Sequence, residues 1–160
     1  MGTILTVAQK GEPILKLKAS DVSSNEFGSA WLYGLAEAMQ STMLVARNGV
    51  GIAAPQVYVS KRVIIVASKA NLRYPDAPEM TPIVMVNPQI LARSEQNNLG
   101  EEGCLSVPNE RSQVPRTNEI FIRYFDLEGQ QIELMLAGFP ARIVQHEIDH
   151  LNGILFVERL

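Results

Sequence analysis

Both histidines of this 160-residue chain, His146 and His150, lie in one H-E-x-x-H motif near its C-terminal end. Positions i and i+4 of an α-helix share one face, so the two imidazoles can bind one metal ion with Glu147 beside it. The motif therefore requires a helix, and the sequence predicts one over residues 137–156. Chance rarely places two histidines at this spacing with a Glu after the first, so we interpret the motif as a metal site.

Two histidines leave a metal site incomplete, so a third protein ligand is needed. The metzincin pattern continues to a third His, but this chain has Phe156 at that position. Thermolysin-like enzymes use a distant downstream Glu, and here the only downstream carboxylate is Glu158, which lies too close to the motif. The third ligand must lie upstream, and the sole cysteine, Cys104, is the candidate. A lone Cys is more often a small buried apolar residue. Here a thiolate with two imidazoles would leave one tetrahedral position for water, which is typical of catalytic sites.

Three motifs of this chain occur together in one known family. Residues 49–56 read G-V-G-I-A-A-P-Q, residues 102–106 read E-G-C-L-S, and residues 145–150 read Q-H-E-I-D-H. With these motifs the chain resembles the peptide deformylases, which carry G-x-G-x-A-A-x-Q, E-G-C-x-S and Q-H-E-x-D-H in the same order. The resemblance covers essentially all 160 residues, and the three motifs together are far more specific than any one alone.

The resemblance implies an activity and a cofactor. The activity is metal-dependent hydrolysis of the N-formyl group from the N-terminal formyl-methionine of newly made polypeptides, which releases formate. The cofactor is one divalent ion, Fe²⁺ in most members, which Zn²⁺, Ni²⁺ or Co²⁺ can replace; the donor types alone would also suit zinc. Glu147 would act as the general base. The Gln56 side chain and the Leu105 backbone N–H would stabilise the oxyanion, as the resemblance implies.

The resemblance also places the methionine side chain of the substrate. Arg111 would border its pocket, although a solvated surface arginine is an almost equal interpretation. Glu102 and Arg116 are expected to form an ion pair that supports the Cys104 loop, and Asp149 to brace the helix or a ligand. The other substrate-binding candidates, named by position, are Val50, Gly51, Phe139, Arg142 and Ile143.

Periodicity predicts an α+β fold, with mostly antiparallel β-sheets around a C-terminal metal-binding helix and a long N-terminal helix. We expect one domain over residues 1–160. The N-terminal helix would begin at Ser24 or Asn25 and end near Arg47, with Asn48-Gly49 as its C-cap. Its apolar face would comprise Trp31, Leu32, Leu35, Met39 and Met43. The remaining expectations are an extended piece at 14–17, strands at 62–66, 83–86 and 89–92, a loop at 68–82, a polar turn at 94–100, and a hairpin of strands 119–126 and 131–136.

Residues 49–54 also fit the dinucleotide-binding pattern G-x-G-x-x-A. That interpretation needs a strand before the loop and a helix after it. Here a predicted helix precedes the motif and a predicted strand follows it, so we reject the dinucleotide interpretation. The glycines instead let the backbone approach a ligand closely.

Composition narrows the class of protein. A net charge of −3 argues against binding nucleic acid through bulk electrostatics. One cysteine excludes an internal disulfide and suits a reducing compartment. No apolar run approaches the ~20 residues that span a bilayer, and no signal-peptide pattern is present. We expect a cytoplasmic protein, and we treat the myristoylation-like pattern of residues 1–6 as coincidence.

Two departures from the family pattern affect the expectations. Tyr58 stands where many deformylases have a glycine, and it is expected to narrow the site entrance. The chain ends about ten residues after the metal helix, without the basic C-terminal helix that docks many bacterial deformylases on the ribosome, which makes direct ribosome contact doubtful.

Two rival functions remain open at the level of sequence. One is a different amidase or peptidase of the zincin type, which the missing downstream ligand disfavours. The other is a non-catalytic or weakly active relative that binds formylated N-termini. Such a relative would lack Glu147, Gln56 or Cys104, and this chain has all three.

Overall fold

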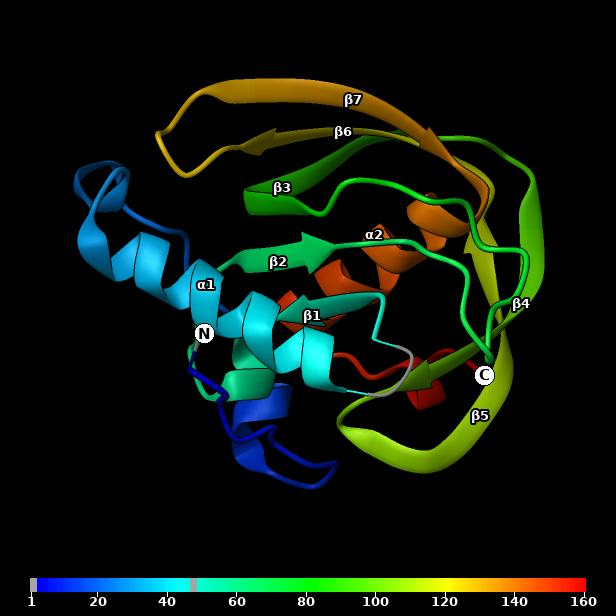
Figure 1. The fold of residues 1–160 in the computed structure, drawn as a ribbon. Helices are drawn as coiled ribbons and strands as arrows, with labels where there is room; N and C mark the ends of the chain where they lie inside the picture. Colours follow the sequence, from blue (N-terminus) through cyan, green and yellow to red (C-terminus); the bar gives the residue numbers. More distant parts are fainter. Residues whose placement is uncertain (1–2, 47–48) are drawn as a thin grey trace.

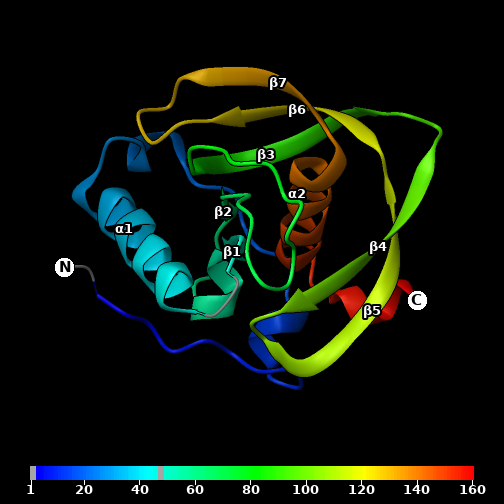
Figure 2. The ribbon, with the colours of Figure 1, turned by 45° about the vertical axis from the view of Figure 1, so that its right-hand side comes forward.

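The computed structural model of the chain describes residues 3–46 and 49–160. A five-stranded sheet in the order β1-β2-β3-β6-β7 and a separate β4–β5 hairpin lie on either side of helix α2 (Figures 1 and 2). All pairings between these strands are antiparallel. The elements are α1 (Ala30–Val45), β1 (Gly51–Ala53), β2 (Val63–Val66), β3 (Ile83–Arg93), β4 (Asn97–Cys104), β5 (Val107–Thr117), β6 (Glu119–Phe125), β7 (Gln131–Ala137) and α2 (Gly138–Leu151).

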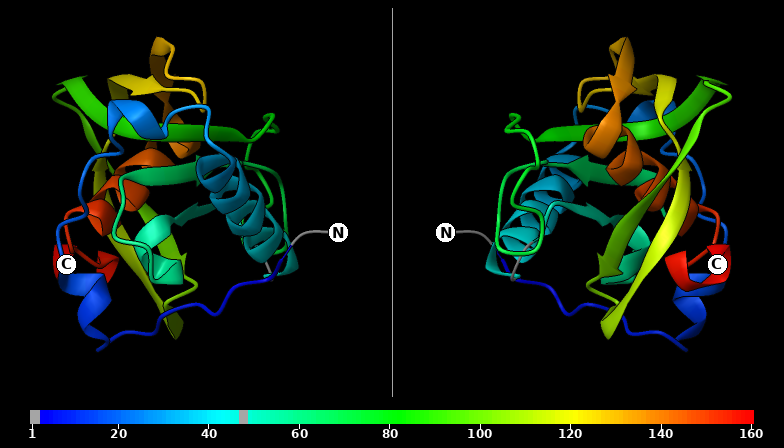
Figure 3. Two further views of the ribbon diagram at one scale, coloured as in Figure 1. Left: turned by 90° about the vertical axis from the view of Figure 1, so that its left-hand side faces the viewer. Right: turned by 90° about the vertical axis from the view of Figure 1, so that its right-hand side faces the viewer.

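Strand β2 separates two parts of the core, which explains its unbroken apolar run. Successive side chains of a strand point to opposite faces. Ile64 and Val66 pack in the cluster that contains the apolar residues of α2. Val63 and Ile65 pack in the cluster that contains those of α1. The two helices therefore cover opposite faces of the sheet at its β1–β2 end, as the views in Figure 3 show.

Helix α1 begins later than the sequence predicts. Ser24–Glu26 forms only a short 3-10 turn, and the chain turns at Gly28, whose φ is +74°. Ser29 then caps the helix by accepting a hydrogen bond from the Leu32 backbone N–H. Trp31, which we expected on the buried face, is 44% exposed. The predicted end at Arg47 and the cap at Asn48 fall on residues 47–48, outside the described residues.

Helix α2 ends earlier than predicted, at Leu151 instead of residue 156. Gly153 adopts a φ of +76°, and a Cβ at this position would lie 2.5 Å from the Lys16 carbonyl oxygen. The glycine thus terminates the helix, a common role for glycine after a last turn. Phe156 lies in a separate 3-10 turn and is fully buried. None of the described helices is both long and apolar enough to cross a membrane.

Three further local predictions were wrong. The strands predicted at 62–66, 119–126 and 131–136 and the loop at 68–82 agree with the structure, whereas β1 and β5 were not predicted. The expected turn at 94–100 is largely strand β4, whose mostly exposed polar residues give no apolar signal. The two strands expected at 83–92 are one strand, because a register shift near Asn87 (φ +50°) absorbs the Asn-Pro pair. The piece at 14–17 is a 3-10 turn, Pro13–Lys16, with proline near its start.

Candidate active site

The three predicted metal ligands meet on the face of α2 that points to the β4–β5 hairpin. One ligand atom from each of Cys104, His146 and His150 lies within 4.8 Å of the other two. Cys104 Sγ is 3.2 Å from His150 Nε2. Both histidines are buried, with ring centres 5.1 Å apart, as expected one helical turn apart. Residues more than forty positions apart in sequence thus form one group of donors.

The end of the β4–β5 hairpin aims Cys104 at the helix. Glu102 pairs with Ser112 and Cys104 with Val107, and the register shifts between these two pairs. Leu105 and Ser106 form the turn that joins the strands. A register shift of this kind bends a strand and redirects its next side chain. The E-G-C-L-S motif therefore describes an irregular strand end followed by a tight turn.

A buried carboxylate, Glu102, holds the first histidine in place. Its Oε1 lies 2.9 Å from His146 Nδ1, and Arg116 donates two hydrogen bonds to it, both of 2.9 Å. Burial alone would raise the pKa of Glu102, but the hydrogen bonds from Arg116 and His146 outweigh it and lower the pKa to about 2. With Nδ1 engaged, His146 presents Nε2 to the donor group, which is the usual arrangement around a metal.

The same ion-pair network continues along α2. Arg116 Nη1 donates to Asp149 Oδ2 at 2.6 Å, and Arg159 binds the same carboxylate at 2.7 and 3.0 Å. The expected Glu102–Arg116 pair is therefore present, and Asp149 ties it to the helix that carries both histidines.

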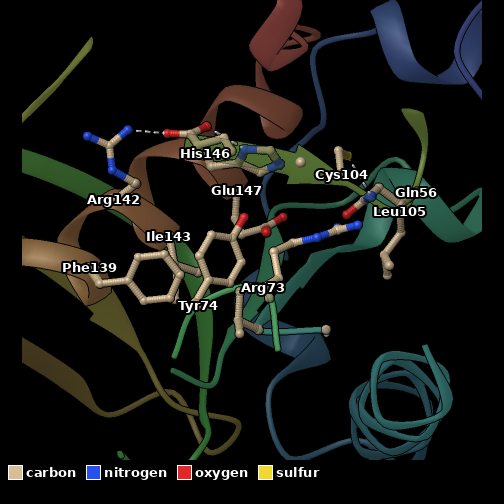
Figure 4. Close-up of a pocket in the computed structure, with 15 residues that line it drawn as sticks. Gln56, Arg73, Tyr74, Cys104, Leu105, Phe139, Arg142, Ile143, His146 and Glu147 are labelled. Carbon is tan, nitrogen blue, oxygen red and sulfur yellow. Dashed lines mark hydrogen bonds and ion pairs between the residues drawn. The ribbon is translucent and has the colours of Figure 1, made fainter. Parts of the chain in front are cut away.

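Arg142 lines the cleft beside the ligands, and its guanidinium is held by partners on the β4–β5 hairpin and by Glu102 (Figure 4). Its Nη1 donates to Glu102 at 2.7 Å and to the Val114 carbonyl at 2.8 Å, and its Nη2 donates to the Asn98 carbonyl at 2.8 Å. A buried charge needs such partners, and the hairpin supplies them on this side of the helix. Arg142 therefore joins α2 to β4 and β5.

Glu147 is buried next to the ligands. Its Oε1 has no hydrogen-bond partner among the described residues. Burial raises the pKa of this carboxyl to about 7, against the attraction of His146. Gly51 makes room for it, because a Cβ there would lie 2.6 Å from Glu147 Oε2 and 2.8 Å from Ile143 Cγ2. A carboxyl with a pKa near neutrality can both accept and donate a proton.

Gln56 is held rigidly at the other side of the site. Its Oε1 accepts a hydrogen bond of 2.9 Å from the Ala53 backbone N–H, and its Nε2 donates to Ser106 Oγ at 3.1 Å. The same Nε2 lies 3.5 Å from Cys104 Sγ. These bonds aim the amide at the thiol, and Leu105 lines the cleft nearby (Figure 4).

A cleft opens onto these groups. Of the predicted substrate-binding residues, Val50, Gly51, Phe139, Arg142 and Ile143 line it. Arg111 is absent from this lining and lies next to Gly103. The sequence interpretation missed two residues of the 68–82 loop, which also line the cleft: Arg73 and Tyr74. Tyr74 packs on Phe139 with ring centres 4.6 Å apart. The only feature of the sequence that could have indicated this role is the aromatic residue, Tyr74, in an otherwise polar loop.

Tyr58 does not narrow the entrance, because its side chain is exposed and is absent from the cleft lining. It bonds through its hydroxyl to Glu12. Its φ is +67°, a conformation that glycine adopts without strain. The backbone therefore explains why a glycine also suits this position.

The donor set fits a divalent metal ion. Sulfur and imidazole nitrogen are the ligands that zinc and comparable ions take. Burial lowers the pKa of His150 well below its ordinary value, which keeps the ring in the neutral form that binds metals. Two histidines one helical turn apart, a thiol and an adjacent buried carboxyl are the components of a metal-dependent hydrolase site.

Comparison with known proteins identifies the family. Residues 4–160 match the polypeptide deformylase family, and the chain belongs to it. Peptide deformylase 2 of Shewanella oneidensis is 51% identical over 155 residues, which are 97% of this chain and 83% of the relative. Peptide deformylase 2 of a Nostoc species is 46% identical over 157 residues, 98% of this chain and 86% of the relative. This chain is therefore a hydrolase that removes the formyl group from nascent peptides.

Solved structures agree with this assignment. The Met-Ala-Ser-bound class I type b peptide deformylase of Acinetobacter baumannii has a TM-score of 0.98 and 65% identity, with both chains fully covered. The actinonin-bound form of that enzyme has a TM-score of 0.90 and 59% identity over 99% of each chain. The family is metal-dependent, which agrees with the donor group formed by Cys104, His146 and His150.

Proposed function

We propose that this chain, acting as one domain, hydrolyses the N-formyl group of N-terminal formyl-methionine with one divalent ion held by Cys104, His146 and His150. The observation that carries the proposal is that these three donors lie together and that two of them, Cys104 and His146, share one cleft with Glu147 and Gln56. When bound, the ion would supply the Lewis acidity that makes a water molecule nucleophilic near neutral pH.

The residues around the donors have separate roles in this proposal. Glu147 takes a proton from the attacking water and passes it to the leaving amine, which its raised pKa favours. The Gln56 amide and the Leu105 backbone N–H donate hydrogen bonds to the oxygen of the formyl group as it becomes negatively charged. Each such donor typically contributes about 10²–10³ in rate.

The methionine side chain fits the apolar part of the cleft. Val50, Phe139 and Ile143 supply this surface, and Tyr74 extends it through its contact with Phe139. Aromatic rings make favourable contacts with a thioether sulfur, and methionine is flexible enough to fill an irregular pocket. A pocket of this kind recognises the side chain next to the formyl group.

We place Fe²⁺ first among the ions, because most members of the family that this chain resembles use it. Zinc is the alternative that the donor types favour. We place the activity in the cytoplasm, where a reducing environment keeps Cys104 from being oxidised and so available as a metal ligand.

The proposal is tested by formate release from a formyl-methionyl dipeptide under anaerobic conditions with Fe²⁺-loaded protein. The matched controls are the acetyl-methionyl and unmodified methionyl dipeptides. Formate release from the formyl peptide, with the two controls left intact, is the expected result. Binding of the formyl peptide without formate release would instead support the alternative, a non-catalytic relative that recognises formylated N-termini. Cleavage of the unmodified peptide would indicate a zincin-type peptidase.

A further inference from the structure

The 3-10 turn Phe156–Arg159, red in Figure 2, lies beside β5 and close to the metal donors. Phe156 is fully buried and belongs to the same apolar cluster as Val107, the strand partner of Cys104, which also packs against this cluster. The Phe156 ring stacks on the His146 ring, with ring centres 6.0 Å apart. The turn is therefore fixed next to two of the three donors.

The last residue of this turn, Arg159, holds the carboxylate of Asp149. Arg159 Nη2 donates to Oδ1 at 2.7 Å and its Nε donates to Oδ2 at 3.0 Å, so both oxygens are engaged. Paired hydrogen bonds of this kind fix the plane of a carboxylate. The Asp149 side chain is buried, whereas that of Arg159 is 45% exposed. Two hydrogen bonds between Leu155 and Glu158 close the turn and hold its backbone in place.

One arginine connects Asp149 to the donor group. Arg116 Nη1 donates to Asp149 Oδ2, and Nε and Nη2 of the same guanidinium donate to Glu102. Glu102 Oε1 lies in turn 2.9 Å from His146 Nδ1. Because a guanidinium is planar and rigid, a movement of Asp149 tilts Arg116 relative to Glu102. The contacts therefore form an unbroken path from Arg159 to His146.

We propose that Arg159 is a positioning residue for His146, a role that rests on the proposed binding of a metal ion by the three donors. It fixes Asp149, and hence the Arg116 guanidinium that orients Glu102. Loss of the residue that directly orients a metal ligand typically costs about 10–100-fold in metal affinity. Arg159 acts through further residues, so we expect a smaller effect of about three- to tenfold. An ion pair that only stabilised the fold would leave metal binding by the folded protein unchanged.

The experiment follows the release of Co²⁺ from the loaded protein into excess EDTA, under anaerobic conditions in which circular dichroism shows the metal-free proteins to be folded. Arg159→Gln keeps a polar side chain of similar length and removes the charge and the paired hydrogen bonds. It is expected to release Co²⁺ about three- to tenfold faster than the unmodified protein. The absorption spectrum of the bound Co²⁺ should also shift, because it depends on the geometry of the ligands.

Arg123→Gln is the matched control. Arg123 also binds a carboxylate, Glu133, through two nitrogens, and its side chain is 37% exposed, but this pair lies on β6 and β7, outside the cleft lining. Its release rate and spectrum should equal those of the unmodified protein. An unchanged rate or an unchanged spectrum in Arg159→Gln, or an equal acceleration in Arg123→Gln, overturns the proposal. If the unmodified protein takes up no Co²⁺, the proposed metal site itself fails, which separates the two outcomes.

Discussion

At the scale of single residues, the properties of the site depend on the surroundings of the Glu147 side chain. Its carboxyl is buried against Gly51, one oxygen lacks a partner among the described residues, and burial raises its pKa to about 7. A group in this position is suited to transferring protons, although ionising it costs stability.

Glu147→Gln keeps the shape of the side chain and removes its basicity. We expect formate release to fall by about 10²–10⁴-fold while metal content is unchanged.

The folded-state pKa of Glu147 lies above its ordinary value, so the buried carboxylate destabilises the metal-free protein as pH rises from about 4.5 to 7 and beyond. The metal-free variant should therefore unfold at higher urea than the parent at pH 8, and at similar urea at pH 4. Retained activity would remove Glu147 from the mechanism.

Gly51→Ala tests the space beside the carboxyl. The new methyl group would contact Glu147 and Ile143 at less than 3 Å, so both side chains must shift. We expect kcat/KM to fall about 10- to 100-fold, since small displacements of a catalytic group are costly. Gly34→Ala is the control, because a Cβ there meets nothing within 4 Å. Equal kinetics for the two variants would contradict the role of Gly51.

At the scale of elements, the sequence predicted the β6–β7 hairpin, β2 and the start of α2 well. Apolar runs bounded by turn residues mark the strands, and the H-E-x-x-H motif marks the helix. The prediction failed where burial leaves no such pattern. Strand β4 gives no apolar pattern because half of its residues are exposed and most of them are polar or glycine. The sequence also could not predict where the Arg142 guanidinium points. Its partners, such as the Val114 carbonyl, belong to strands about thirty residues or more away in sequence. Spacing alone placed Arg142 near the metal ligands, but only the fold shows which way its charge points.

Arg142→Met tests how α2 is joined to the hairpin. Removing one partner of a buried ion pair leaves Glu102 undercompensated, and we expect a loss of about 3 kcal/mol in the free energy of unfolding. Metal affinity should fall about 10- to 100-fold, since Glu102 also orients His146. Urea unfolding and competitive metal titration measure the two effects. Arg123→Met, which breaks the more exposed pair with Glu133, should cost at most about 1 kcal/mol.

At the scale of the whole molecule, the ion-pair network makes the stability of the metal-free protein sensitive to acid. The pKa of Glu102 is about 2 in the folded chain, below its ordinary value of 4.5. Its stabilising contribution is therefore complete above pH 4.5 and is lost as pH falls from about 4.5 toward 2. Urea midpoints measured across this range should decline. The decline should be smaller in Glu102→Gln, and an equal decline in both proteins would show that other groups cause it.

We predict that deformylation requires one metal ion, held by Cys104 and the two histidines. Metal-stripped protein is titrated anaerobically with Fe²⁺ while formate release from a formyl-methionyl dipeptide is measured. The predicted result is a linear rise from negligible activity to a plateau at one ion per chain. Full activity in the stripped protein, or no activity after one equivalent has bound, would contradict the account.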